Sequence, residues 1–199
     1  LSKDTNKDGK VDQFGLTMPV TANTGMVYYF VTFLWQGGAE LYNKDFSSAA
    51  FDSTAAVKAA QYLQKLVAYQ VLPLANIADA FLNGRAAMAM ASTSSLGYYR
   101  SAAKFDLGIA HMPAGVKKVT GVGGSSIGIL KSEKAREDAA FSFVKWLTSD
   151  AISTRWAIAT GYTPARKSAI NSKEYKAVMA SDPLVATVVS QLDCARPRP

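Results

Sequence analysis

The segment FLNGRAAMAMASTSSLGYYR, residues 81–100, carries the strongest fold signal in the chain. Its first residues end a short helix predicted over Ile77–Leu82, and Gly84 is typical of the residue that follows a helix C-terminus. The small apolar residues of Ala86–Ala91 predict a strand. The four hydroxyl residues Ser92–Ser95 then offer N-caps for a helix that extends to about Ala103. A strand that leads directly into a capped helix indicates an α/β fold.

Helix and strand signals alternate on both sides of this segment. Before it we predict a strand at Phe14–Met18, a buried helix at Met26–Trp35, and a helix from Asp52 or Ser53 to about Tyr69. After it we predict strands at Phe105–Met112 and Ile127–Leu130 with a glycine-rich turn at Gly121–Gly124 between them, and helices from Ser132 to Leu147, from Asp150 to Gly161, near Ser172–Ala180 and near Pro183–Leu192. The pattern is mixed α/β with helix in excess. Because few strands are adjacent in the sequence, we expect part of the sheet to come from chain outside it.

Composition excludes several classes of protein. The 199 residues include one cysteine and one histidine, too few for a disulfide scaffold or a structural zinc site. The longest apolar run, Met26–Trp35, is shorter than the ~20 residues of a membrane-spanning helix. The net charge of +7 comes from scattered lysines and arginines without a nucleic-acid-binding motif, so we expect no nucleic-acid partner.

One motif resembles the nucleophile of a serine hydrolase. Residues Gly124–Gly128 match G-x-S-x-G, with Ser126 at the position of the nucleophile. That motif requires a helix after the serine, whereas a strand is predicted here. The only histidine, His111, precedes the serine, whereas that fold places it after the serine. We therefore expect no catalytic residues, and a hydrolase acting through Ser126 is the distant alternative.

The N-terminal residues Asp4, Asn6, Asp8 and Asp12 have the spacing of a calcium-binding loop. The twelfth position of that loop is Gly15 instead of a bidentate glutamate, so the strongest ligand is missing. A turn built by Asx side chains and glycine explains the same residues, and we favour it. A calcium-stabilised module stays open as an alternative, and neither a metal nor a cofactor is predicted.

The hydroxyl cluster Ser92–Ser95 supports two interpretations. A helix N-terminus presents unpaired N–H groups and the positive end of the helix dipole, which suits a phosphate or another anion. Alternatively, one serine caps the helix and the others face solvent. The sequence does not separate these two interpretations.

Five segments in fixed order resemble the family-1 extracellular solute-binding proteins of bacterial ABC importers, and most closely the members that bind glycerol-3-phosphate and glycerophosphodiesters. These segments are FLNGRAAMAM with the serines that follow it (residues 81–95), FDLGIAHMP (105–113), the pair Gly123-Gly124, AAFSFVKWL (139–147) and TGYTP (160–164). The resemblance extends over nearly the whole chain.

The resemblance implies a two-lobed α/β fold of the periplasmic-binding-protein type (type II), which closes on its ligand. It also implies that this chain is a fragment that lacks most of the first lobe and the C-terminal end. Residues 1–105 and 148–199 would belong to the second lobe. Residues 106–147 would form a strand across the hinge, at Asp106–Pro113, and a returning segment of the first lobe.

The resemblance also implies the ligand contacts. Ser92 would donate its hydroxyl to phosphate or glycerol oxygens, Gly124 would let its backbone N–H approach the ligand, and Tyr162 would offer a ring face and a phenolic O–H. Ser95 is a further candidate. The implied protein is not an enzyme: it would deliver glycerol-3-phosphate or a glycerophosphodiester to an ABC permease, in the periplasm or at the outer face of the cytoplasmic membrane. A sugar or oligosaccharide is the alternative ligand.

Overall fold

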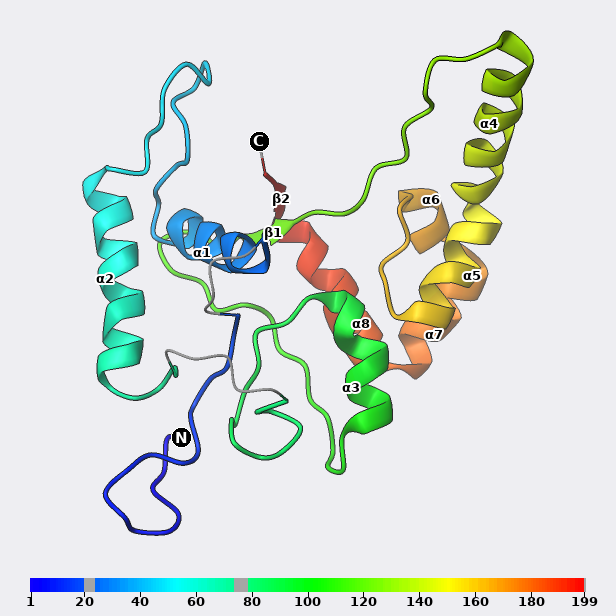
Figure 1. The fold of residues 1–199 in the computed structure, drawn as a ribbon. Helices are drawn as coiled ribbons and strands as arrows, with labels where there is room; N and C mark the ends of the chain where they lie inside the picture. Colours follow the sequence, from blue (N-terminus) through cyan, green and yellow to red (C-terminus); the bar gives the residue numbers. More distant parts are fainter. Residues whose placement is uncertain (20–23, 74–78, 199) are drawn as a thin grey trace.

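Helices dominate the computed structural model, which describes residues 1–19, 24–73 and 79–198 (Figure 1). The α-helices are α1 (Thr24–Gln36), α2 (Thr54–Ala68), α3 (Leu96–Ala102), α4 (Lys134–Leu147), α5 (Asp150–Thr160), α6 (Lys167–Ile170), α7 (Lys173–Ser181) and α8 (Pro183–Ser190). Two 3₁₀ helices, η1 (Thr93–Ser95) and η2 (Gln191–Cys194), and two parallel strands, β1 (Thr120–Val122) and β2 (Ala195–Pro197), complete the described elements.

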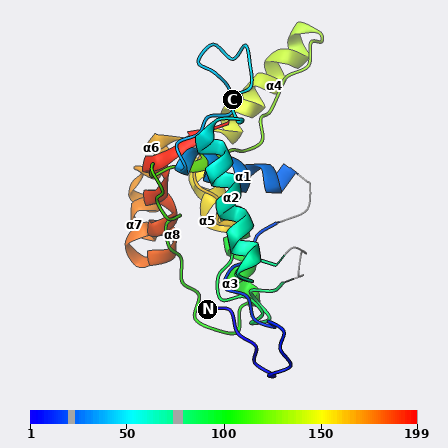
Figure 2. The same cartoon turned by 90° about the vertical axis from the view of Figure 1, so that its left-hand side faces the viewer.

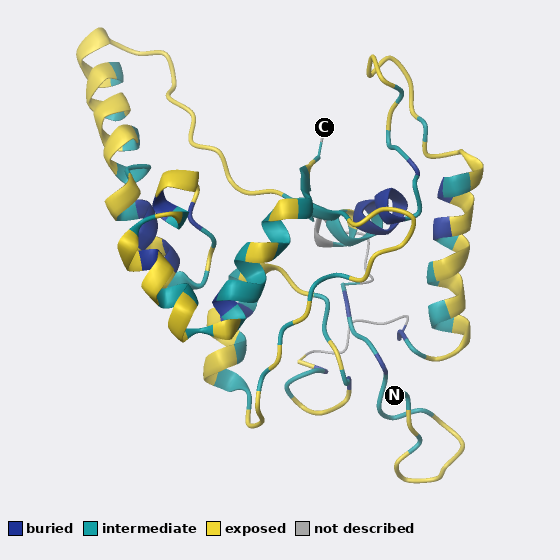
Figure 3. Ribbon diagram, turned by 180° about the vertical axis from the view of Figure 1, so that it is seen from behind, coloured by how far each residue is buried: buried dark blue, intermediate teal, exposed yellow. Residues whose placement is uncertain are grey.

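Helix α1 is the most deeply buried element. It contains no charged residue, and it carries the fully buried side chains Val31, Leu34 and Trp35. A helix without a charged face is stable in water only where other elements surround it. Figure 3 shows α1 as the main block of buried residues between more exposed arms. The helix predicted at Met26–Trp35 is therefore confirmed.

Strand β1 packs on α1 through two buried polar side chains. Thr32 Oγ1 accepts a hydrogen bond from the Gly121 N–H at 3.0 Å, and Gln36 Nε2 donates one to the Val119 carbonyl at 3.0 Å. A Cβ on Gly121 would lie 3.0 Å from Thr32 Oγ1, so the absence of a side chain allows this close approach. Gly121 pairs with Arg196 in the register of β1 and β2, which brings the C-terminal segment to the same face of α1.

Two arginines stack on α1 from this C-terminal segment. The Arg196 guanidinium lies 4.5 Å from the centre of the Trp35 ring, and that of Arg198 lies 3.6 Å from the centre of the Tyr28 ring. Arg196 also forms an ion pair with Glu40 at 2.6 Å, and its hydrogen bond holds the pKa of the Glu40 carboxyl below its ordinary value. Cation–π contacts of this kind add to the stability of an interface that apolar burial creates.

Helix α2 covers α1 from one side (Figure 2). Ser53 caps it, as predicted, by accepting a hydrogen bond from the Ala56 N–H. Ala56 and Ala59 are buried against Leu34 and Ala39, where small side chains let the two helices approach closely.

The C-terminal helices form a second core. Leu96 of α3, Ala157 of α5, Tyr175 of α7 and Val185 of α8 are its buried members. Gly161 ends α5, as predicted, with φ at +79°, a conformation that glycine adopts at little cost. The predicted helices near Ser172–Ala180 and Pro183–Leu192 correspond to α7 and α8.

Helix α4 and the segment before it, residues 123–133, extend away from these cores (Figure 1). Large apolar side chains on α4 are exposed, including Phe141, Phe143 and Trp146. The predicted cap is wrong: Glu133 occupies the N-cap position of α4, and the Ser132 N–H instead donates to the Glu137 carboxylate at 2.7 Å.

Four strand predictions are wrong at the level of regular secondary structure. Residues 14–18 and 86–91 make only the isolated bridges Phe14–Ala86 and Thr17–Ala89, and residues 105–112 and 127–130 form no strand in the described chain. Residues 14–17 and 85–90 do pair with each other through a few backbone hydrogen bonds, such as those from the Phe14 N–H to the Arg85 carbonyl and from the Thr17 N–H to the Met88 carbonyl, but the pairing is too short for regular strands. Residues 105–112 and 127–130 make no backbone pairing of this kind with the rest of the described chain.

Two further local predictions need correction. Gly121 lies in β1 and not in a turn, because its backbone pairs with Arg196. Within the predicted helix Ile77–Leu82, residues 79–82 form turns, and residues 77–78 lie outside the described residues. Among the described helices, none combines the length and the apolar character needed to cross a membrane.

Substituting Gly115 tests how closely the loop before β1 packs on the end of α1. A Cβ at Gly115 would lie 2.6 Å from the Gln36 carbonyl oxygen, whereas one at Gly128 would meet no atom within 4 Å. We expect Gly115→Ala to lower the free energy of unfolding by about 1–3 kcal/mol, because the backbone must move. Gly128→Ala is the matched control, and urea unfolding compares the two. Equal stability of both variants would contradict the described packing.

The Glu40–Arg196 ion pair predicts a pH dependence of stability. Because the folded pKa of Glu40 lies below its ordinary value of 4.5, the pair stabilises the fold above that pH and loses its effect as pH falls through the folded pKa. Both side chains are partly exposed, so we expect Glu40→Gln to cost no more than about 1 kcal/mol at pH 7. The difference from the parent should shrink in acid. A difference that is constant from pH 7 to pH 3 in urea unfolding would contradict this assignment.

Candidate functional site

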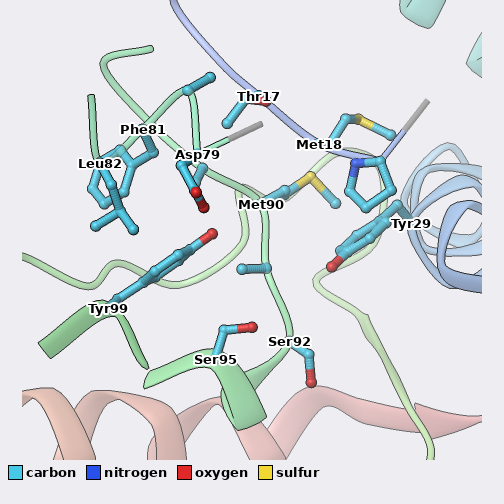
Figure 4. A pocket seen from close by; sticks show the side chains of 14 residues that line it. Thr17, Met18, Tyr29, Asp79, Phe81, Leu82, Met90, Ser92, Ser95 and Tyr99 are labelled. Atoms are coloured by element: carbon cyan, nitrogen blue, oxygen red, sulfur yellow. The ribbon is translucent and has the colours of Figure 1, made fainter. Parts of the chain in front are cut away.

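A cavity of about 350 Å³ opens beside the start of α3. Five parts of the chain line it: residues 17–19, α1, the turns at residues 79–82, residues 89–92 and the first turns of η1 and α3. Figure 4 shows the Tyr29 and Tyr99 side chains on different sides of this space, with Ser92 and Ser95 along its lower edge. The segment from which the fold was inferred, residues 81–100, thus contributes much of the wall.

Ser92 and Ser95 both line the cavity, but their hydroxyls have different roles. Ser92 is the N-cap of η1: its Oγ accepts hydrogen bonds from the Ser94 N–H at 3.3 Å and from the Ser94 hydroxyl at 2.9 Å. Ser95 makes no capping hydrogen bond at the start of α3. Ser92 therefore caps η1 while it lies at the cavity, so the capping interpretation of the cluster holds for this one residue.

Tyr162 lies next to the same helix end. A Cβ on Gly161 would lie 3.3 Å from the Gly97 nitrogen and 3.4 Å from the Leu96 side chain, so the Gly161–Tyr162 turn packs against the first turn of α3. Tyr162 is 47% exposed, so about half of its surface is open to solvent. The turn therefore brings an exposed tyrosine to the region of Ser92 and Ser95, although Tyr162 does not line the cavity itself.

Gly124 is not among the described residues that line the cavity. A Cβ on the preceding Gly123 would lie 2.3 Å from the Tyr28 phenolic oxygen, so Gly123 lies directly against Tyr28. The next residue of α1, Tyr29, lines the cavity. Gly124 itself is exposed, and a Cβ there would meet no atom within 4 Å. The structure therefore does not bring Gly124 into contact with Ser92 or Ser95, and its role as a ligand contact stays a prediction.

Among the residues of the cavity that the sequence analysis missed, three are titratable: Tyr29, Asp79 and Tyr99. Burial raises the pKa of Tyr29, against the opposing effect of a hydrogen bond with the Ser92 backbone. Burial and the nearby Asp79 charge raise the pKa of Tyr99, so both phenols stay protonated at neutral pH. Tyr99 follows the serine cluster by four residues and could have been placed on the cavity side of α3, whereas no local signal singles out Asp79.

The residues of the two rejected motifs make other contacts. His111 Nε2 lies 2.7 Å from the Ser190 Oγ, so its hydrogen-bond partner is a residue of α8 and not Ser126. The Asp12 carboxylate accepts hydrogen bonds from the Thr5 hydroxyl and from backbone N–H groups, and Asp4 accepts from the Asp8 and Gly9 N–H groups. Within residues 1–19, 24–73 and 79–198, no three histidine, cysteine or acidic side chains gather as metal ligands.

Removing the Ser92 hydroxyl separates its capping role from its place at the cavity. We expect Ser92→Ala to lower the free energy of unfolding by about 1 kcal/mol, the usual cost of a lost N-cap. Ser95→Ala is the matched control, because Ser95 lines the same cavity without a capping hydrogen bond. Thermal or urea unfolding of both variants provides the measurement, and equal losses would contradict the capping assignment.

Comparison with known proteins identifies the family. The model of the bacterial extracellular solute-binding protein family matches residues 2–187. No curated protein matches the chain significantly. Similar solved structures include UgpB from Mycobacterium tuberculosis in complex with glycerophosphocholine, with 25% identity and a TM-score of 0.82 over 94% of this chain and 48% of that one.

Two sugar-binding structures are also similar. The cyclic alpha-maltosyl-1,6-maltose binding protein from Arthrobacter globiformis has 25% identity and a TM-score of 0.80, over 94% of this chain and 49% of that one. The maltose/maltodextrin-binding domain MalE from Bdellovibrio bacteriovorus, bound to maltotriose, has 27% identity and a TM-score of 0.79, over 100% of this chain and 52% of that one. The chain thus spans about half the length of these two-lobed proteins. It belongs to the bacterial extracellular solute-binding protein family.

Proposed function

We propose that this chain is the larger part of one lobe, with a segment of the other, of a protein that captures a small polar solute and delivers it to an ABC permease. The observation that carries the proposal is the convergence at the start of α3, where Ser92 and Ser95 line a cavity and the turn with Tyr162 packs beside it. This site combines hydroxyl groups and phenols with apolar side chains, a mixture that suits reversible binding of a small polar solute.

The proposed division into lobes places residues 1–105 and 148–199 in one lobe and residues 106–147 in the hinge and the other lobe. Its support is the course of the chain after β1, where residues 123–133 and α4 leave the two cores (Figure 1). Exposed apolar side chains on α4 suit a surface that packs against another part of a protein. Binding would then work by closure, because a ligand that contacts both lobes favours the closed state.

The first ligand we propose is glycerol-3-phosphate or a glycerophosphodiester. The similarity to a structure that holds glycerophosphocholine supports this choice. The second candidate is a sugar or oligosaccharide, which the similarity to the maltotriose-bound structure favours. Either ligand implies a site of action in the periplasm or at the outer face of the cytoplasmic membrane, with an ABC permease as partner.

Calorimetry on the full-length protein tests the ligand. We expect glycerophosphocholine or glycerol-3-phosphate to bind and maltose not to bind. Tyr162→Ala should weaken binding by about five- to tenfold, because a ring contact and a phenolic hydrogen bond are lost. Tyr69→Ala is the control, since Tyr69 is more exposed and lies at the end of α2, away from the cavity. Binding of maltose alone would refute the phosphate ligand, and unchanged affinity in Tyr162→Ala would refute the site.

A further inference from the structure

The cavity beside α3 has an unusual charge for this protein. The chain carries 22 lysines and arginines against 15 acidic residues, yet Asp79 is the only charged side chain among the described residues that line the cavity. Asp79 belongs to none of the ion pairs found in the described chain. The cavity therefore presents one uncompensated negative charge within a basic protein.

Hydrogen bonding and aromatic side chains place this carboxylate at the cavity. The Tyr98 phenol donates a hydrogen bond to Asp79 Oδ1 at 3.1 Å. Tyr98 belongs to α3 and does not itself line the cavity. The Asp79 charge also raises the pKa of the neighbouring Tyr99 phenol. Figure 4 shows the Asp79 carboxylate close to the Tyr99 hydroxyl at the edge of the open space.

Three aromatic rings and two methionines line the cavity beside small and aliphatic residues. The rings of Phe81 and Tyr99 are in contact, with their centres 5.6 Å apart and their planes inclined by 53°. Tyr29 lies across from them, Met90 lies between, and Met18 lies on the side of Tyr29 (Figure 4). Faces of aromatic rings attract cations, and aromatic sites that recognise quaternary ammonium ligands use this attraction. A quaternary ammonium group has no N–H donors, so it loses no hydrogen bonds to water when it enters such a site. An acid combined with several rings is the side-chain set that recognises a quaternary ammonium group.

The same wall is poorly suited to the other groups that a solute could place there. Among the described residues that line the cavity, none is a lysine, arginine or histidine that could hold a phosphate, and none is an asparagine or glutamine with the paired donor and acceptor that sugar hydroxyls use. From these observations we infer that the cavity binds the cationic head group of a glycerophosphodiester, with Asp79 as its counter-charge and Tyr29, Phe81 and Tyr99 as its aromatic walls. This inference rests on the proposed function and narrows its ligand to a zwitterion.

A pair of ligands that differ only in charge tests the inference. Glycerophosphocholine is compared with its 3,3-dimethylbutyl analogue, in which carbon replaces the ammonium nitrogen and the shape is kept. We expect the full-length protein to bind glycerophosphocholine roughly tenfold more tightly than the neutral analogue in calorimetry. Asp79→Asn should reduce this preference to about twofold or less, because the amide keeps the shape but not the charge.

Two control variants separate charge from structure. Tyr98→Phe removes the hydrogen bond to Asp79 but keeps the carboxylate, so the preference for the cation should remain. Asp52→Asn removes an exposed acid just before α2, away from the cavity, and should leave both affinities unchanged. A preference lost equally in Asp52→Asn would mean that the overall charge, and not the cavity, attracts the cation, and would overturn the inference.

The remaining outcomes distinguish the inference from the proposed function. Equal affinity for both phosphodiesters, or an unchanged preference in Asp79→Asn, would overturn the cationic subsite while leaving the solute-binding function intact. Binding of maltotriose and of neither phosphodiester would overturn the proposed ligand class and the inference with it. Tighter binding of glycerol-3-phosphate than of glycerophosphocholine would place a phosphate where the inference places a cation, and would also refute the subsite.

Discussion

The burial of α1 is the constraint on which the arrangement of this chain depends. Trp35 is fully buried, and its Nε1 has no hydrogen-bond partner among the described residues, so packing and the stacked Arg196 must compensate for that donor. With α1 held in this way, two adjacent tyrosines take fixed places. Tyr28 supports Gly123, and Tyr29 enters the cavity. A shift of α1 would therefore move the contact with Gly123 and the Tyr29 wall of the cavity together.

The contact of α1 with β1 also directs the chain that follows. Thr32 and Gln36 hold β1 by hydrogen bonds to main-chain groups, so they fix its position without requiring a particular side chain on the strand. Immediately after β1, residues 123–133 leave the cores and lead to α4 (Figure 1). The direction of this arm, and with it the place of Gly124, follows from the same buried polar contacts that anchor the strand.

Local signals predicted the helices well, and the strands poorly, for a physical reason. Ser53 caps α2 and Gly161 ends α5 through contacts within a few residues, which the sequence displays directly. The pairing of Gly121 with Arg196 joins residues 75 positions apart, so no local pattern identifies β1 or β2. The bridges that replace the predicted strands near residues 14–17 and 86–89 depend equally on distant partners.

The same distinction applies to the candidate site. Ser92 and Ser95 could be predicted to lie at a helix start because the hydroxyl cluster is a local signal, and the structure places both at the cavity. Gly124 and Tyr162 were suggested by family resemblance, and their role as ligand contacts stays a prediction. Asp79 could not be predicted, since its significance comes from the rings that surround it in space and not from its neighbours in sequence.

The strengths of the electrostatic interactions at the cavity bear on whether it binds an anionic or a cationic group of a solute. The start of α3 offers an anion little, because a helix terminus contributes about 0.3–1 kcal/mol and Ser92 already uses the Ser94 N–H for its cap. A carboxylate at the same cavity opposes that anion: two like unit charges repel by about 4 kcal/mol at 4 Å where the effective dielectric constant is about 20, and by less at an exposed position such as that of Asp79. Asp79 and the helix end therefore act on an anion in opposite directions, whereas Asp79 and the aromatic rings both attract a cation.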